Sequence, residues 1–201
     1  MTERFVVLEG GDGSGKSTQQ HRLVEWLRAE GVDAIETREP GGTALGLELR
    51  RLLLHGFEIA DRAEALLMAA DRAQHVAEVI RPALARGCWV VSDRHVSSSL
   101  VYQGVVRGLG VGVVASLSEF AADGLVPDLV VMLDVDDVTA AQRRSPTADR
   151  MEREGDDFHA AVRQAYRDLA AQFGWTVIDG AGSPEAVAAR VRDTVRPLLA
   201  R

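Results

Sequence analysis

The chain alternates short apolar runs with longer amphipathic stretches. Cys88–Asp93 and Leu129–Asp134 are continuous apolar runs that end in aspartate, a pattern typical of parallel strands covered on both faces. Phe5–Leu8 is long enough for a buried parallel strand, and Asp33–Thr37 and Trp175–Asp179 are the remaining predicted strands. We therefore expect a five-stranded parallel sheet.

Helical spacing of apolar residues appears between and after these strands. Gly31 should stop the first helix, and Pro82 should bend or end a long helix that begins at Glu64. The stripes expected to face the core are Leu23, Trp26 and Leu27; Leu66, Ala70, Ala73, Ala77 and Ile80; Phe158, Val162, Ala165, Leu169 and Phe173; and Val187, Val191, Val195 and Leu198. This alternation of strands and helices predicts a three-layer α/β/α sandwich in one domain spanning residues 1–201.

A phosphate-binding loop is predicted between the first strand and the first helix. The pattern G-x-x-x-x-G-K-[ST] runs from Gly10 to Ser17, in the strand, loop, helix order that it requires. Its glycines allow positive φ and close approach of backbone N–H groups to a polyphosphate. Lys16 would reach the β- and γ-phosphates, and the Ser17 hydroxyl would bind Mg²⁺. The loop residues expected to bind nucleotide are Gly10, Gly11, Asp12, Gly13, Ser14, Gly15, Lys16, Ser17 and Thr18.

Composition narrows the class of protein. With 201 residues, 46% of them hydrophobic, the chain can bury a substantial core, and the net charge of −7 argues against a broad nucleic-acid or membrane surface. The single cysteine, Cys88, lies in an apolar run and excludes a disulfide framework. We see no signal peptide and no apolar run near the roughly 20 residues that span a bilayer. We expect a soluble, cytoplasmic protein.

Charged residues gather where predicted strands end, which is where open α/β sheets bind ligands. Arg38 follows the second strand, and Asp93 and Arg94 end the third. Either Asp93 or Asp134 could be the carboxylate beside Mg²⁺, and spacing alone leaves both open.

A segment rich in arginine, Gln142 to Glu154, lacks an apolar stripe. We interpret it as a basic lid over the site, with a solvated charged loop as the alternative. Its arginines are Arg143, Arg144, Arg150 and Arg153.

Among P-loop proteins of this size the choice is mainly between a small kinase and a switch GTPase. The Asn-Lys-x-Asp segment that a GTPase would use to recognise guanine is absent from the sequence. The basic lid and the acidic–basic pairs at strand ends favour phosphoryl transfer between two bound nucleotides.

Over nearly its whole length the chain resembles the thymidylate kinases, which make dTDP from dTMP and ATP. The resemblance implies a bacterial-type enzyme that uses Mg²⁺ with ATP and forms a homodimer. The motifs that carry it are Glu9 to Thr18, Arg38 to Thr43, Arg72, Asp93 to His95, Ser98, Ser99, Tyr102 to Gly104, Pro127 to Leu129, Leu133, Asp134, Asp149 and Arg150.

The same resemblance implies roles for single residues. Arg38 and Arg94 would clamp the acceptor phosphate, Asp12 would face its deoxyribose, and Asp93 rather than Asp134 would lie beside Mg²⁺. For the base and sugar, Arg72 would bond the thymine carbonyl, Ser99 would lie near the base edge and Tyr102 would pack under the sugar. Ser98 and Gln103 complete the predicted dTMP site, Arg143 joins the ATP site, and the predicted catalytic residues are Lys16, Asp93, Arg94 and Arg150.

Two positions depart from the family pattern. Met68 stands where an aromatic residue commonly stacks on thymine, four residues before Arg72, and a thioether can still lie over a ring. Gly13 stands where some members carry an arginine, and lid arginines would then supply that charge.

Two other functions stay open at this point. One is a kinase for another deoxynucleoside monophosphate or a related small acceptor, and the other is a regulatory P-loop ATPase. Arg38, Arg72 and Arg94 argue against the ATPase, because they have no task without a second anionic substrate.

Overall fold

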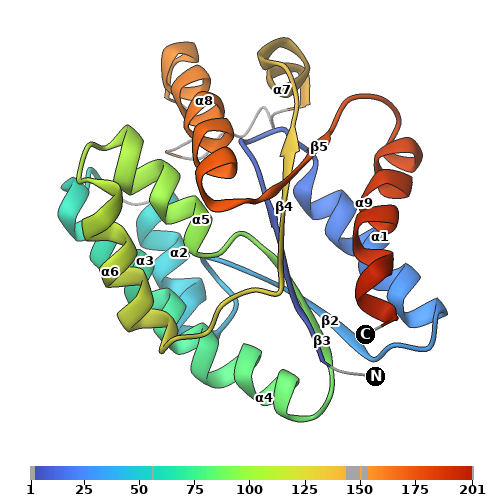
Figure 1. Ribbon diagram of the computed structural model, residues 1–201. Helices are drawn as coiled ribbons and strands as arrows, with labels where there is room; N and C mark the ends of the chain where they lie inside the picture. Colours follow the sequence, from blue (N-terminus) through green and yellow to red (C-terminus); the bar gives the residue numbers. More distant parts are fainter. Residues whose placement is uncertain (1–2, 56, 144–149, 151–153, 201) are drawn as a thin grey trace.

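The computed structural model of the protein describes residues 3–55, 57–143, 150 and 154–200, and shows a parallel sheet of five strands in the order β2-β3-β1-β4-β5 (Figure 1). The strands are β1 (Phe5–Glu9), β2 (Ala34–Arg38), β3 (Trp89–Asp93), β4 (Leu129–Asp134) and β5 (Thr176–Asp179). The helical segments are α1 (Lys16–Ala29), α2 (Ala44–His55), α3 (Asp61–His75), η1 (Val76–Ile80), α4 (Arg81–Ala85), α5 (Val96–Ser99), η2 (Leu100–Val106), α6 (Val111–Ala122), α7 (Asp137–Arg143), α8 (Asp156–Phe173) and α9 (Pro184–Leu199).

Helices cover both faces of the sheet, which confirms the predicted three-layer sandwich (Figure 1). Alternate residues of a strand point to opposite faces, so Val6 and Leu8 pack in one cluster with α1 and α9. Phe5 and Val7 pack on the other face, against η1 and α4. Both cores are apolar, as the continuous hydrophobic strands predict.

The register predicted for the long helix is wrong. Leu66 is 59% exposed, and Ala70, Ala73 and Ala77 are exposed as well. The inner face of α3 instead carries polar residues, among them Glu64, Asp71, Arg72 and His75, all of which are buried. Hydrophobic periodicity could not find this face, because its burial depends on hydrogen-bond partners supplied by other segments.

Pro82 does not end the helical path. The chain passes from α3 through the π-helical segment η1 into α4, where Pro82 lies in the first turn. A proline inside a continuous helical path removes one backbone hydrogen bond, and the irregular π-helical segment η1 directly precedes it. The sequence analysis also left out the helical segments α2, α5, η2, α6 and α7.

The ends of the central strands meet at one edge of the sheet. Leu8 of β1 and Arg38 of β2 both pair with Asp93 of β3. The phosphate loop, the turn after Arg38 and the loop that begins with Arg94 therefore lie side by side. None of the helices that the structure describes is long and apolar enough to cross a membrane.

Candidate active site

A cavity of about 580 Å³ opens at this edge of the sheet. The phosphate loop, the ends of β2 and β3, and parts of α2, α3 and η2 line it. The sequence-predicted site residues all line it except Gly10, Gly11, Ser14, Arg72 and Ser99. Arg144 and Arg153, the other two lid arginines, lie outside the described residues.

The phosphate loop has the backbone that its glycines predict. Gly10, Gly13 and Gly15 have φ of 140°, 83° and 92°, a range that other residues rarely adopt. Lys16 is buried, donates to the Gly11 carbonyl at 2.9 Å and lines the cavity. Burial lowers the pKa of Lys16, and an anionic ligand beside it would favour its charged form.

The two candidate carboxylates for a metal have different neighbours. The Ser17 hydroxyl donates to Asp93 Oδ2 at 2.7 Å, and the buried Asp93 Oδ1 has no hydrogen-bond partner among the described residues. Asp134 instead accepts from Arg163 Nε at 2.8 Å. A hydroxyl and an underused carboxylate oxygen at the phosphate loop fit the oxygen ligands that Mg²⁺ prefers, which favours Asp93.

Arg94 is held in a strained backbone conformation, with φ of 73°. Its guanidinium lies 2.5 Å from Asp12 Oδ1 and donates to Ser98 Oγ at 3.1 Å and to the Tyr166 hydroxyl at 3.0 Å. It also lies over the ring of Tyr102, 5.2 Å from the centroid. Strain at a residue fixed by so many contacts is typical of a functional position.

The charge of Asp12 depends on the neighbouring Arg94 guanidinium. Burial alone would raise the pKa of Asp12, but Arg94 and Lys16 lower it below its usual value.

Tyr166, which contacts Arg94, was not predicted from the sequence. It comes from α8 and falls within an apolar stripe, so no local signal marks it.

Arg38 differs from Arg94 in its contacts with the part of the chain that the structure describes. It is exposed and lines the cavity, and its side chain has no hydrogen bond or ion pair to the described residues. An arginine that the fold leaves unpaired inside a cavity can bind an anion without losing an existing partner.

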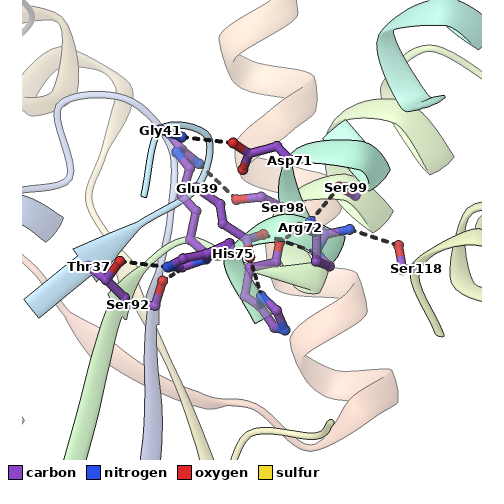
Figure 2. A network of polar contacts seen from close by, with 12 residues as sticks. Thr37, Glu39, Gly41, Asp71, Arg72, His75, Ser92, Ser98, Ser99 and Ser118 are labelled. Atoms are coloured by element: carbon purple, nitrogen blue, oxygen red, sulfur yellow. Dashed lines mark hydrogen bonds and ion pairs between the residues drawn. The ribbon is translucent and has the colours of Figure 1, made fainter. Parts of the chain in front are cut away.

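Arg72 lies behind the cavity wall rather than in it. Figure 2 shows its guanidinium directed at other protein groups, and only 1% of the residue is exposed. It donates to Glu39 Oε2 at 2.9 Å, Ser118 Oγ at 3.1 Å, Ser99 Oγ at 2.9 Å and the His95 carbonyl at 3.1 Å. The contacts expected between a base and Arg72 or Ser99 stay predictions.

Glu39 is the centre of this buried network (Figure 2). Its Oε1 lies 2.9 Å from His75 Nδ1 and 2.8 Å from His95 Nδ1. Because an ionised carboxylate only accepts, both Nδ1 atoms carry the hydrogen. Burial would raise the pKa of Glu39, but His95 and Arg72 hold it well below its usual range.

The network joins the turn after β2, the helix α3 and the loop after β3, all of which border the cavity. Glu39 directly follows Arg38, and His95 directly follows Arg94. Glu39 and His95 fall within motifs that carry the family resemblance, but no role was predicted for either. His75 was not predicted at all, although it follows Arg72 by three positions and so shares its helix face.

Two further arginines border the cavity. Arg143 donates to the carbonyls of Gly180 and Gly182 at 3.1 and 3.3 Å, in the loop after β5. Arg150 donates to the Leu53 carbonyl at 2.8 Å and forms an ion pair with Glu64. In this structure Arg150 is bound to α2 and α3, and its catalytic role stays a prediction.

We expect Glu39→Gln to lower the free energy of unfolding by about 3–5 kcal/mol, because it leaves the buried Arg72 guanidinium without its counter-ion. Denaturant unfolding measures the change. Glu36→Gln, at an exposed position of β2 three residues before Glu39, is the matched control. Equal midpoints for the two variants would contradict this account of the network.

Asp71 gives a prediction for pH. It accepts from the Gly41 N–H at 3.1 Å, and burial and the nearby Glu39 raise its pKa from 3.8 to about 6. Because the pKa is higher in the folded state, the protonated carboxyl stabilises the fold fully below about pH 4, and this contribution is lost as the pH rises through about 6. The free energy of unfolding of Asp71→Asn should therefore rise relative to that of the wild type between pH 4 and 7, by up to about 3 kcal/mol.

The measurement for Asp71→Asn is denaturant unfolding at several pH values, with the exposed Asp193→Asn as control. A difference between wild type and Asp71→Asn that stays constant with pH would show that Asp71 ionises alike in both states.

Comparisons with known proteins agree with this geometry. A family model described as thymidylate kinase matches residues 8–191. The thymidylate kinase of Clavibacter michiganensis subsp. michiganensis is 49% identical over 206 residues, covering 100% of this chain and 98% of that protein. That of Leifsonia xyli subsp. xyli is 51% identical over 193 residues, covering 94% and 92%. That of Bifidobacterium longum strain NCC 2705 is 50% identical over 205 residues, covering 98% and 100%.

The family model spans most of the chain, and these relatives align over nearly their full lengths. The chain therefore belongs to the thymidylate kinase family.

Proposed function

We propose that this protein phosphorylates dTMP to dTDP with MgATP by direct in-line transfer, as a step in dTTP biosynthesis. The observation that carries the proposal is the pairing of two kinds of anion site in one cavity. A phosphate loop with Lys16 lines one part, and the arginines Arg38 and Arg94 line another. A cavity of this form can hold two phosphate-bearing substrates and offset their repulsion.

On the donor side, backbone N–H groups of the loop and Lys16 would bind the β- and γ-phosphates of ATP. Ser17 and Asp93 would hold Mg²⁺, which would offset the negative charge of the phosphates. Arg143, beside the loop after β5, would contact ATP.

On the acceptor side, Arg38 and Arg94 would bind the phosphate of dTMP. Asp12, which Arg94 keeps ionised, would face the deoxyribose, with Tyr102 beneath it. Met68 would lie over the base. Holding both substrates in line accounts for most of what phosphoryl transfer requires, and no covalent intermediate is needed.

Residues 142–154 would close over the two substrates as a lid and exclude water. Arg150 would then exchange its partners on α2 and α3 for the transferred phosphoryl group. Gly13 has no side chain to supply that charge.

The alternatives make different demands on the cavity. A regulatory ATPase gives Arg38 no ligand, although its guanidinium has no partner among the residues that the structure describes. A kinase for another deoxynucleoside monophosphate would use the same phosphate clamps, and only the base-binding residues distinguish it.

We also propose a cytoplasmic homodimer. Leu66 on α3 and Val113 and Phe120 on α6 are exposed by 59%, 67% and 86%, and α3 packs against α6. A second copy of the chain could cover these residues, which sedimentation velocity can test. The buried, unpaired Cys88 suits a reducing compartment.

The test of function is ADP formation with ATP, Mg²⁺ and each nucleoside monophosphate in turn. dTMP should be the best acceptor, dUMP weaker and purine monophosphates poor. Lys16→Ala should largely remove turnover without unfolding the protein. Faster reaction with AMP or GMP would overturn the proposal.

Met68→Phe should keep or improve dTMP binding, because a flat ring adds offset stacking worth about 0.5–1.5 kcal/mol. Met68→Ala should weaken binding. Calorimetry with dTMP measures both, and Leu47→Ala, which truncates a side chain that is 54% exposed on α2, is the control. If affinity is indifferent to both changes at Met68, the base lies elsewhere.

A further inference from the structure

Glu64 is a buried carboxylate at the cavity to which the proposed reaction assigns no role. It lies in the first turn of α3, lines the cavity and is 2% exposed. Its Oε1 accepts from Gln103 Nε2 at 2.8 Å and lies 3.8 Å from Arg107 Nε. Its Oε2 forms the ion pair with Arg150. Both oxygens are therefore engaged.

The bond to Glu64 fixes the orientation of the Gln103 amide. A glutamine amide can usually be turned either way, but an ionised carboxylate only accepts, so the NH₂ group must face Glu64. The amide oxygen is then directed elsewhere. Gln103 is 3% exposed and lines the cavity, and its buried Oε1 has no hydrogen-bond partner among the described residues. A buried acceptor without a partner at a cavity wall is costly unless a ligand donates to it.

Met68 places the base near this acceptor. It follows Glu64 by four positions, so the two share one face of α3, and Met68 also lines the cavity. Gln103 lines the same cavity, so a base lying over Met68 shares the cavity with the Gln103 amide. Thymine and uracil carry an N–H at ring position 3, whereas cytosine carries a lone pair there.

We propose that Glu64 is a positioning residue that sets base specificity, by holding Gln103 so that its amide oxygen faces the acceptor base. This rests on the proposed function and deepens it. An amide oxygen accepts from the N–H of thymine and meets the lone pair of cytosine unfavourably. A carboxylate at Glu64 only accepts, so the Gln103 amide that is bound to it has no alternative orientation.

The test compares kcat/KM for dTMP and dCMP in wild type and Glu64→Gln. A glutamine at position 64 can donate as well as accept, so the Gln103 amide can turn and offer its NH₂ to cytosine. The dTMP/dCMP preference should fall about ten- to hundredfold, as expected when a hydrogen bond to a buried acceptor decides specificity. If Glu64 has a purely structural role, kcat/KM falls equally for dTMP and dCMP and their ratio stays unchanged. That result would overturn the proposal.

Asp61→Asn is the matched control, because it neutralises a half-exposed carboxyl in the same turn of α3, 3.7 Å from Arg107. Asp61→Asn should keep the wild-type kcat/KM for both dTMP and dCMP. A fall in its dTMP/dCMP preference equal to that of Glu64→Gln would overturn the proposal.

If Glu64→Gln does not fold, Gln103→Leu carries the test. It removes the amide oxygen, and the ratio should fall similarly, so an unchanged ratio in Gln103→Leu would overturn the proposal. A wild-type protein inactive on dTMP would overturn the proposed function instead, so the two failures are distinguishable.

Discussion

Positive charge has to be held at the carboxyl edge of the sheet before two anionic substrates can meet there. A buried guanidinium is costly unless an anion and further hydrogen bonds accompany it. The fold meets this requirement with a carboxylate for each of three arginines: Asp12 for Arg94, Glu39 for Arg72 and Glu64 for Arg150. Arg38 has no such partner among the described residues, which leaves its charge available to an acceptor phosphate.

Packing against neighbouring segments, as well as phosphate binding, requires glycine at positions of the phosphate loop. A Cβ at Gly13 would lie 2.3 Å from the Ala140 carbonyl of α7, and one at Gly10 would lie 2.6 Å from the Leu133 carbonyl. Any side chain at position 13 would therefore collide with the helix that leads into the lid segment. This gives a physical reason for glycine at a position where some family members carry arginine, and it makes the lid the expected source of the missing charge.

Local signals in the sequence were enough to predict the sheet, the phosphate loop and the charged residues at the strand ends, because each depends on residues that are neighbours along the chain. Spacing alone could not choose between Asp93 and Asp134, since the difference lies in Ser17 and Arg163, which come from other elements. The register of α3 was predicted wrongly for a similar reason. Its buried face is polar and is stabilised by Glu39, more than 30 residues earlier. Arg72 consequently lies behind the wall of the cavity.

The central claim is that Arg38 is reserved for the acceptor phosphate. Calorimetric binding of dTMP and of thymidine, which lacks the phosphate, to wild type and to Arg38→Met tests it most directly. Wild type should bind dTMP far more tightly than thymidine, and Arg38→Met should reduce that preference about tenfold or more while thymidine affinity stays the same, as expected for a charged hydrogen bond. An Arg38→Met protein that keeps the full preference for dTMP would contradict the account.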